Sequence, residues 1–552
     1  MIAFTNFSFW YPGRANATLR QIDFAVGPGE FVLLTGPTGC GKSTLLKCLN
    51  GVIPHLSGGK CEGEIFIHGQ DTRTFTMGEL SAEVGLVQQS PDDQIFATCI
   101  QDEVAFGPEN LCLDRDKIEE QVTWALKAVE LDGYRQRSTN ALSGGQKQRL
   151  ALAAMLSLNP RILALDEPVS QLDPQGADEV MAVIRNLNKK YGVTVVMVEH
   201  RIHEVAQFVD RMVVMENGRI AYDAPVREAM LHADEFVAMG LRLPETVEIS
   251  RRFHKHCAAL TVQETVDLLK SGCPRQRGLP AECSEDAKGE PAVVAIEDLF
   301  YRYGKQDQPA LCGVNLKVRQ GEKVAVMGRN GSGKSTLLAH MAGMIVPQQG
   351  VVTIAGQLIR RRLSLPLGTV GLVMQNPDLM LFHRSVRQEV IFGLENLKLE
   401  EKIRTERYSK AMEGFALTAL QADPPLSLSR GQRLRTATAA VAAMNPSVIF
   451  LDEPTTGQDQ DHIDSMMTSL LEQAETVVFC THDVETVIRY ASRVVVMEQG
   501  RIVADEIPRK IFADEPFLLR YGLRPTQSWL VGRTLGLEDV FTPGELERRW
   551  SC

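Results

Sequence analysis

Short apolar runs recur along the chain, and two of them end at a glycine-rich segment. The run Phe31–Thr35 leads into GPTGCGKST, which begins at Gly36, and the run Lys323–Met327 leads into GRNGSGKST, which begins at Gly328. Short apolar runs bounded by glycine are typical of strands that are buried on both faces. The pattern therefore predicts, at two places, a buried strand followed by a tight loop and a helix.

Other apolar positions extend this picture within each half. A helical spacing relates Ile118, Val122, Ala125, Leu126 and Val129, which indicates the core-facing stripe of an amphipathic helix. Four more apolar runs predict further strands of a largely parallel sheet, at 162–165, 193–198, 448–451 and 476–480. Alternation of such strands with helices predicts the α/β fold class.

The second half of the chain repeats the first. After the glycine-rich segments, QSPD at Gln89 returns as QNPD at Gln375, LSGGQ returns as LSRGQ and LDEP returns as LDEP, all in the same order. Such self-similarity predicts two domains of one fold with insertions confined to loops. GLRLP at Gly240 is echoed by GLRP at Gly522, so each domain is expected to carry a small C-terminal appendix. We predict a first domain at 1–225 with an appendix at 226–270, a linker rich in Gly and Pro at 271–291, and a second domain at 292–507 with an appendix at 508–552.

Composition narrows the functional class only a little. Of the 552 residues, 44% are hydrophobic and 23% are charged, as in ordinary globular proteins, and the net charge of −10 gives no global attraction for nucleic acid. The first residues read as a strand, without the pattern of a secretory signal. No uninterrupted apolar stretch reaches the ~20 residues of a membrane-spanning helix. We therefore expect a cytosolic chain with reduced cysteines that reaches a membrane only through partners.

The two glycine-rich segments have the form GxxxxGK[ST], which cradles phosphate groups. Glycines allow backbone N–H groups to converge on phosphate oxygens at a helix N-terminus. Lys42 and Lys334 add a positive charge there, and Ser43 and Ser335 offer a hydroxyl to Mg²⁺. The sequence thus predicts two ATP sites that include Gly36, Gly39, Gly41, Lys42, Ser43, Thr44, Gly328, Gly331, Gly333, Lys334, Ser335 and Thr336.

Acidic pairs end one predicted strand in each half. Such strand ends meet at the carboxyl edge of the sheet, where nucleotide is expected. Asp166 and Asp452 are predicted to hold Mg²⁺, while Glu167 and Glu453 are predicted to polarise the attacking water. A solvated acidic strand end is the plainer alternative, and the glycine-rich segments argue against it.

LSGGQ at 142–146, shortly before the first acidic pair, narrows the class of phosphate-binding protein. Together with the other motifs, it makes nearly the whole chain resemble the ATP-binding-cassette (ABC) ATPases. The resemblance implies an ATPase with two tandem P-loop domains, each with a helical signature subdomain, and ATP held between the glycine loop of one domain and the signature of the other. Both composite sites then form within one chain. The signature residues expected at ATP are Ser143, Gly144, Gly145, Gln146, Ser429, Gly431 and Gln432.

The resemblance also assigns roles to residues outside the shared motifs. His200 and His482 match a switch histidine that senses the γ-phosphate, and Gln89 and Gln375 match a glutamine that contacts ATP and Mg²⁺. Tyr11 and Tyr303 match the aromatic residue that stacks on adenine. For these two tyrosines, packing in the core remains an alternative interpretation.

The two ATP sites are expected to differ. Arg430 replaces the third residue of the second signature, and Gln458 stands where the family usually has an aliphatic residue. The resemblance places the altered signature against the nucleotide held by Lys42. Because Ser429, Gly431 and both glutamates remain, we expect two hydrolytic sites of different rate rather than one inactive site.

The segment after each predicted glutamine loop indicates a biological role. VQQSPDDQIF at 87–96 and DEVAFGPEN at 102–110, with their repeats at 373–378 and 388–396, resemble the ATPase subunits of energy-coupling factor importers, including the cobalt group. That resemblance implies integral membrane partners, attachment to the cytoplasmic face of the cell membrane, and uptake of a vitamin, a vitamin precursor or a transition-metal ion. The alternative is a soluble twin-cassette ATPase acting on ribosomes or nucleic acid, for which a long charged helical linker would be expected.

Overall fold

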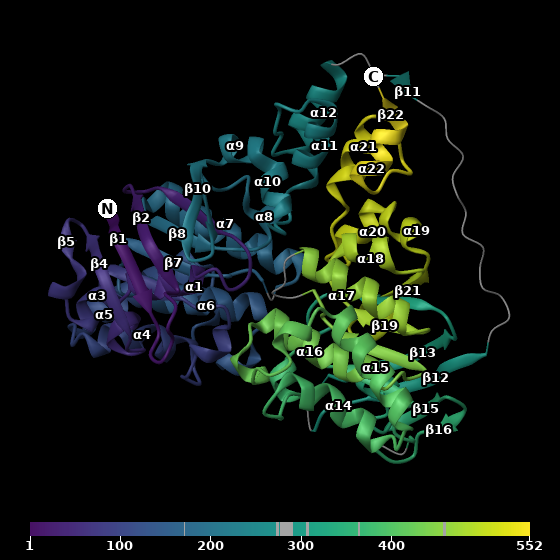
Figure 1. The fold of residues 1–552 in the computed structure, drawn as a ribbon. Coiled ribbons are helices and arrows are strands. Elements are labelled where there is room, and N and C mark those ends of the chain that lie inside the picture. Colours follow the sequence, from purple (N-terminus) through teal and green to yellow (C-terminus); the bar gives the residue numbers. More distant parts are fainter. Residues whose placement is uncertain are drawn as a thin grey trace. The chain divides into compact units, whose positions relative to one another are not determined.

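The computed structural model describes residues 1–170, 172–271, 275–276, 291–304, 308–362, 365–455 and 460–551. It divides the chain into two compact units, Met1–Leu269 and Lys270–Cys552. Figure 1 shows the first unit in purple to teal and the second mainly in green and yellow. Of the predicted linker 271–291, only residues 271, 275–276 and 291 are described, and the predicted domain boundaries stay predictions.

The first unit contains a six-stranded sheet that is parallel except at one edge. Its order is β10-β9-β3-β8-β7-β6, and only β10 runs antiparallel to its neighbour. The strands are β3 (Phe31–Thr35), β6 (Val84–Val87), β7 (Ile162–Asp166), β8 (Thr194–Val198), β9 (Arg211–Glu216) and β10 (Arg219–Pro225). The strands predicted at 31–35, 162–165 and 193–198 are thus confirmed as β3, β7 and β8.

A second, antiparallel sheet of the first unit has the order β2-β1-β4-β5. Its strands are β1 (Ile2–Trp10), β2 (Leu19–Val26), β4 (Lys60–Ile67) and β5 (Gln70–Asp71). The helices of the unit are α1 (Lys42–Leu49), α2 (Val52–His55), α3 (Met77–Glu83), α4 (Ile100–Asn110), α5 (Arg115–Ala128), α6 (Gly144–Leu156), α7 (Pro174–Tyr191), α8 (Ile202–Val205), α9 (Val226–Ala229), α10 (Ala233–Ala238), α11 (Glu245–Phe253) and α12 (Val262–Ser271).

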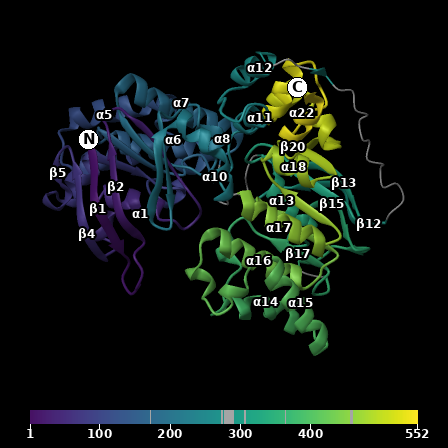
Figure 2. The same ribbon diagram turned by 45° about the horizontal axis from the view of Figure 1, so that its top comes forward.

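Alternate residues of the central strands enter two separate cores. In β3, Phe31 and Leu33 pack with residues of α4 to α7, whereas Val32 and Leu34 pack with α1 and the antiparallel sheet. This alternation is the period of two expected of a strand covered on both faces. Figure 2 shows β1, β2 and β4 side by side within the first unit, as their order in the antiparallel sheet requires.

The second unit repeats this architecture with the sheet order β17-β18-β19-β14-β20-β21 and the antiparallel order β13-β12-β15-β16. Its strands are β12 (Ala292–Tyr301), β13 (Leu311–Arg319), β14 (Lys323–Met327), β15 (Gln349–Ile354), β16 (Gln357–Leu358), β17 (Val370–Val373), β18 (Val448–Asp452), β19 (Val477–Cys480), β20 (Arg493–Glu498) and β21 (Arg501–Glu506). A two-residue strand, β11 (Arg275–Gln276), pairs with β22 (Trp550–Ser551).

The helices of the second unit follow the same order as those of the first. They are α13 (Lys334–Met341), α14 (Val386–Asn396), α15 (Glu401–Gly414), α16 (Arg430–Ala443), α17 (Gln460–Gln473), α18 (Val484–Tyr490), α19 (Pro508–Phe512), α20 (Glu515–Arg520), α21 (Gln527–Thr534) and α22 (Pro543–Arg549). Among the residues that the structure describes, no helix combines the length and the apolar character needed to cross a bilayer.

Candidate functional site

The glycine loops require glycine because the backbone passes very close to a neighbouring strand. Gly36 has a φ of 143°, and a Cβ there would lie 2.1 Å from the carbonyl oxygen of Met215. Gly328 repeats this with a φ of 139° and a distance of 2.2 Å to the carbonyl oxygen of Met497. Gly41 and Gly333 adopt left-handed conformations as N-caps of α1 and α13. Both loops are therefore open to the close approach of an anion at a helix N-terminus.

Each loop encloses a buried lysine ammonium group. Lys42 donates to the carbonyl oxygens of Gly36, at 2.8 Å, and of Pro37, at 2.9 Å. Lys334 donates to those of Gly328, at 2.8 Å, and Arg329, at 3.1 Å. A charge held inside a curl of backbone N–H groups suits a phosphate group.

A hydroxyl and a carboxylate meet beside the first loop. Ser43 Oγ, in the first turn of α1, donates to Asp166 Oδ1 at the end of β7 over 2.9 Å. At the equivalent place, a hydrogen bond from Ser335 lowers the pKa of Asp452, although burial raises that pKa overall. Asp452 Oδ1 is buried without a hydrogen-bond partner within the described residues. These hard oxygen groups fit Mg²⁺, whose charge would neutralise phosphate oxygens.

Ionisation of the buried Asp166 carboxyl group lowers the free energy of unfolding of the chain. Burial, reinforced by the Glu167 carboxylate, raises the pKa of Asp166 from 3.8 to about 6. The protonated form therefore stabilises the folded chain below about pH 4, and this stability is lost as the pH rises to about 6. Above that pH the ionised group costs about 3 kcal/mol.

Asp166→Asn is therefore expected to raise the melting temperature of the nucleotide-free chain. The amide oxygen still accepts from Ser43, but no buried charge remains. We expect a rise of several degrees at about pH 7.5 and roughly half as much at about pH 5, measured by thermal unfolding. Asp93→Asn, at an exposed carboxylate, is the control and is expected to change neither value. A lower melting temperature for Asp166→Asn at pH 7.5 would contradict this account.

Glu167 lies at the centre of a cluster of polar side chains from three strand ends. Gln89, in the loop after β6, donates through Nε2 to Glu167 Oε2 over 2.6 Å. His200 Nε2, after β8, lies 3.2 Å from Glu167 Oε1. In the second unit, His482 Nδ1 lies 3.0 Å from Glu453 Oε2, and Gln375 is exposed in the loop after β17. Parallel strands thus bring together the side chains that the sequence singled out separately.

Both glutamates adopt an unusual backbone conformation. Glu167 has a φ of 49° and Glu453 a φ of 51°, in the left-handed region that residues with a side chain rarely occupy. The N–H group of each donates to the neighbouring strand, to Val198 at 2.9 Å and to Cys480 at 3.0 Å. Such strained positions are common in functional sites.

The two signature motifs form identical N-caps. Ser143 Oγ accepts from Gln146 N at 3.3 Å while the Gln146 side chain accepts from Ser143 N, and Ser429 and Gln432 repeat this capping box. The caps leave the N-terminus of α6 or α16 positively polarised. Arg430 occupies the first turn of α16 without disturbing its cap. Gln458, the other predicted difference, lies outside the described residues.

The other predicted glycines of the motifs lie close to another chain segment, in left-handed loop positions or in the first turn of a signature helix. A Cβ at Gly145 would lie 3.3 Å from the Cα of Gly176, so the signature helix packs against the start of α7 there. Gly39 and Gly331 have φ values of 83° and 81°. Gly144 and Gly431 lie in the first turns of α6 and α16. The predicted signature residues are thus gathered at one helix end in each unit.

The two candidate adenine-binding tyrosines lie beside the glycine loops. Tyr11 OH is 3.2 Å from Thr44 Oγ1, and Tyr303 OH is 3.3 Å from Thr336 Oγ1. Tyr11 is half-buried against Phe9, whereas Tyr303 is exposed. Exposure of Tyr303 argues against the core-packing alternative at that position, but the role of both tyrosines in binding adenine stays a prediction.

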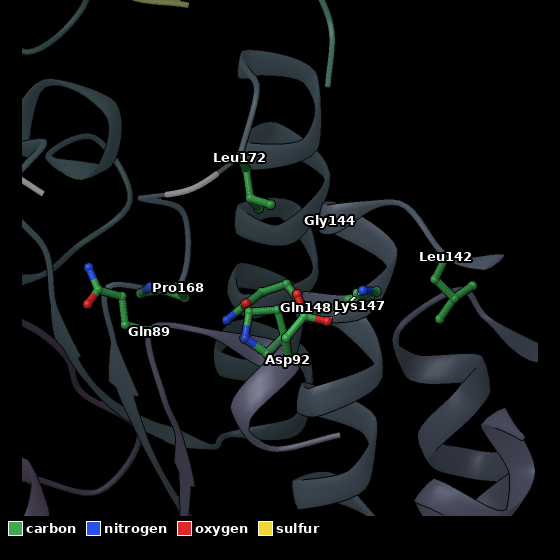
Figure 3. Close-up of a pocket in the computed structure, with 9 residues that line it drawn as sticks. Gln89, Asp92, Leu142, Gly144, Lys147, Gln148, Pro168 and Leu172 are labelled. Carbon is green, nitrogen blue, oxygen red and sulfur yellow. Dashed lines mark hydrogen bonds and ion pairs between the residues drawn. The ribbon is translucent and has the colours of Figure 1, made fainter. Parts of the chain in front are cut away.

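An ion pair that the sequence analysis missed connects each glutamine loop to its signature helix. Lys147 Nζ lies 2.5 Å from Asp92 Oδ1, and Arg433 Nε lies 2.9 Å from Asp378 Oδ1. In the first unit this pair borders a cavity of about 200 Å³ that Gln89 also lines, shown in Figure 3. The repeat could have shown these pairs, because both members recur at matching positions.

Two glycine loops, each with a lysine, an acidic pair and a capped signature helix, define a tandem P-loop ATPase. The family model "ABC transporter" matches residues 19–170 and 311–456. The chain is 46% identical over 550 residues to an ABC transporter ATP-binding protein of Methanosarcina mazei, covering 98% of this chain and 94% of that protein. It is 35% identical over 531 residues to one of Caldanaerobacter subterraneus subsp. tengcongensis, covering 94% and 93%.

The chain therefore belongs to the ABC transporter family of ATP-binding proteins and is an ATPase that uses ATP and Mg²⁺. Among solved structures, it is similar to cbiO1 from Clostridium perfringens, described as part of the ABC transporter complex cbiONQ. That structure is 33% identical, covers 45% of this chain and 100% of its own, and gives a TM-score of 0.39.

Proposed function

We propose that this chain is the ATP-hydrolysing motor of an importer of the energy-coupling factor type. It acts on the cytoplasmic face of the cell membrane and drives uptake of a vitamin, a vitamin precursor or a transition-metal ion through separate membrane subunits. The observation that supports this most is a pair of exposed aromatic rings after the glutamine loop, repeated in both units.

The aromatic pairs are unusually exposed for their size. Phe96 and Phe106 are 61% and 46% exposed, with ring centroids 4.3 Å apart. Phe382 and Phe392, at the matching positions, are 65% and 42% exposed, with centroids 5.2 Å apart. Exposed apolar groups gathered in one place favour a protein partner. The same arrangement in both units suits a pair of similar helices from membrane subunits.

A buried carboxylate fixes each aromatic pair in place. Glu103 Oε2 accepts from the N–H groups of Phe96, at 3.1 Å, and Ala97, at 2.7 Å. Glu389 Oε2 accepts in the same way from Phe382, at 3.0 Å, and from the next residue, at 2.8 Å. Satisfied buried carboxylates of this kind order a loop. The aromatic surface is therefore preformed, which lowers the entropic cost of docking a partner.

Within this function, Glu167 and Glu453 would each polarise the water that attacks the γ-phosphate. His200 and His482 hold these carboxylates in place and sense the phosphate. Lys42 and Lys334 bind phosphate oxygens. Mg²⁺ would be held by Ser43, Gln89 and Asp166 in the first unit and by Ser335, Gln375 and Asp452 in the second.

Each nucleotide would lie between the glycine loop of one unit and the signature of the other. The capped helix behind Ser143 then faces the nucleotide of Lys334, and that behind Ser429 faces the nucleotide of Lys42. ATP joins the units, and hydrolysis releases them. The Lys147–Asp92 and Arg433–Asp378 ion pairs pass this movement from the signature to the aromatic surface. Since Arg430 alters one signature, the two sites turn over at different rates.

Replacing Phe96 and Phe382 together by Asp tests the importer proposal. Two exposed carboxylates on the aromatic surfaces are expected to lower the amount of chain recovered with membranes by more than about tenfold, because charge opposes apolar docking. The chain is tagged, the amount recovered with membranes is measured, and the proteins that co-purify with it are identified. Leu231→Asp, at an exposed apolar residue of the appendix, is the matched control and is expected to leave recovery unchanged.

The soluble alternative gives a different result in the same experiment. A twin-cassette factor would co-purify with ribosomes or nucleic acid, and the aspartates at Phe96 and Phe382 would leave its recovery with membranes at the background level. Thermal unfolding of each variant separates lost docking from lost folding. Recovery of the unaltered chain with ribosomes rather than with an integral membrane protein would overturn the importer proposal.

A further inference from the structure

Glu199 is a buried acidic residue at the end of β8 that the proposed function does not use. Its side chain has no exposed surface. Its Oε1 accepts from the backbone N–H of His200, at 2.9 Å, and from that of Arg201, at 3.1 Å. One carboxylate oxygen thus folds the three-residue segment into a turn, much as a capping side chain does at a helix start.

The two residues held by Glu199 both reach the segment that contains Glu167. The His200 ring lies 3.2 Å from the Glu167 carboxylate. The Arg201 guanidinium donates to the backbone carbonyl of Val169, two residues beyond Glu167, over 2.8 Å. The carboxylate and the loop that follows it are therefore both connected to the turn that Glu199 forms.

The second unit makes this connection differently. Thr481 stands at the place of Glu199, and its Oγ1 accepts from Asp483 N at 3.1 Å and lies 3.1 Å from Thr455 Oγ1. Asp483, at the place of the arginine, caps α18 instead. A carboxylate cannot donate to a backbone carbonyl, so Asp483 cannot form the bond that the arginine forms. In the second unit, the hydroxyl pair of Thr481 and Thr455 therefore stands in place of the contacts that Glu199 and its neighbouring arginine make in the first.

We propose that Glu199, acting through the turn that it forms with Arg201, is a positioning residue that sets Glu167 and His200 for hydrolysis in the first unit only. The inference rests on the proposed roles of Glu167 and His200. It supplies a second reason, besides Arg430, for the two sites to have different rates.

The side chain of Glu199 need not carry a charge to do this. Glu199 Oε2 has no hydrogen-bond partner within the described residues. Burial raises the pKa of Glu199 to about 7; Arg201 opposes this rise, and Glu167 and Glu204 reinforce it. A glutamine amide offers the same oxygen to the two N–H groups without a charge. Glu199→Gln is therefore the conservative variant, and Glu199→Thr copies the second unit.

The test uses the full chain in a Glu453→Gln background, where turnover reports the first site. Glu199→Thr is expected to lower kcat about tenfold or more while KM for ATP changes less than twofold, because a misplaced carboxylate affects the reaction more than binding. Glu199→Gln is expected to restore kcat to within about threefold. In a Glu167→Gln background, where turnover reports the second site, the loss caused by Glu199→Thr is expected to stay under about twofold.

A second variant keeps the proposal testable if Glu199→Thr unfolds the chain. Arg201→Met preserves the turn but removes the contact with Val169, and it is expected to lower kcat in the Glu453→Gln background alone. No loss from either variant there, or equal losses in both backgrounds, would overturn the inference while leaving the proposed function intact. If Glu167→Gln itself leaves turnover undiminished, the proposed role of Glu167 fails, and this inference fails with it.

Discussion

Replacing Glu167 and Glu453 together by glutamine is expected to lower ATP turnover of the purified chain by about a thousandfold. A glutamine amide keeps the shape of the side chain but cannot accept a proton from the attacking water, and positioned general bases are typically worth 10²–10⁴-fold. Each carboxylate lies beside a histidine, at 3.2 Å for Glu167 and 3.0 Å for Glu453, and both glutamates have a left-handed backbone conformation.

The loss of ATP turnover is measured by the rate of phosphate release. Equilibrium binding of ATP shows whether the affinity for ATP has also changed. Affinity for ATP is expected to be kept or raised, because neither lysine nor either glycine loop is altered. The single variants extend the test to the asymmetry of the sites. We expect unequal losses from Glu167→Gln and Glu453→Gln, since Glu199 and Arg430 each distinguish the sites. Equal losses would contradict the asymmetry, and a double variant that kept a tenth of the turnover would contradict the assigned bases.

The buried parallel strands could be predicted from the sequence, whereas the antiparallel sheets could not. Runs such as residues 31–34 are apolar at every position because both faces of β3 are covered, so they stand out from their surroundings. In β1 the pairing with β2 shifts register between Phe4 and Phe7. This irregularity breaks the alternation of apolar and polar residues by which a strand covered on one face is recognised. The first residues were still predicted as a strand, which β1 confirms, but no regular pattern showed that β1 belongs to an antiparallel sheet.

In the candidate site, too, some contacts could be predicted from the sequence and others could not. Residues that follow strand ends, such as Glu167 and His200, could be placed together because the carboxyl ends of the neighbouring parallel strands β7 and β8 share one edge. The Lys147–Asp92 ion pair depends on how α6 packs against the glutamine loop, so the only signal for it in the sequence is that both residues recur with like charge in the second half, as Arg433 and Asp378. Glu199 was harder still to find, because Thr481 replaces it in the second half and the repeat therefore gave no signal.

The central claim is that each nucleotide is held by the glycine loop of one unit and the signature of the other. This claim predicts which pairs of substitutions alter the same ATP site. Lys42→Ala and Ser429→Tyr would damage one site, so the other stays whole. Lys42→Ala and Ser143→Tyr would damage both. Combined with Glu167→Gln and Glu453→Gln, which prevent hydrolysis, these pairs can be compared by the amount of ATP that each chain retains.

The decisive measurement is the number of labelled ATP molecules retained per chain after rapid removal of free nucleotide. For Lys42→Ala with Ser429→Tyr, the account predicts about one retained ATP, and for Lys42→Ala with Ser143→Tyr it predicts almost none, because lesions within one site do not add. The reverse order would show that each unit binds ATP with its own signature and would contradict the account. Equal retention by the two variants would contradict it as well.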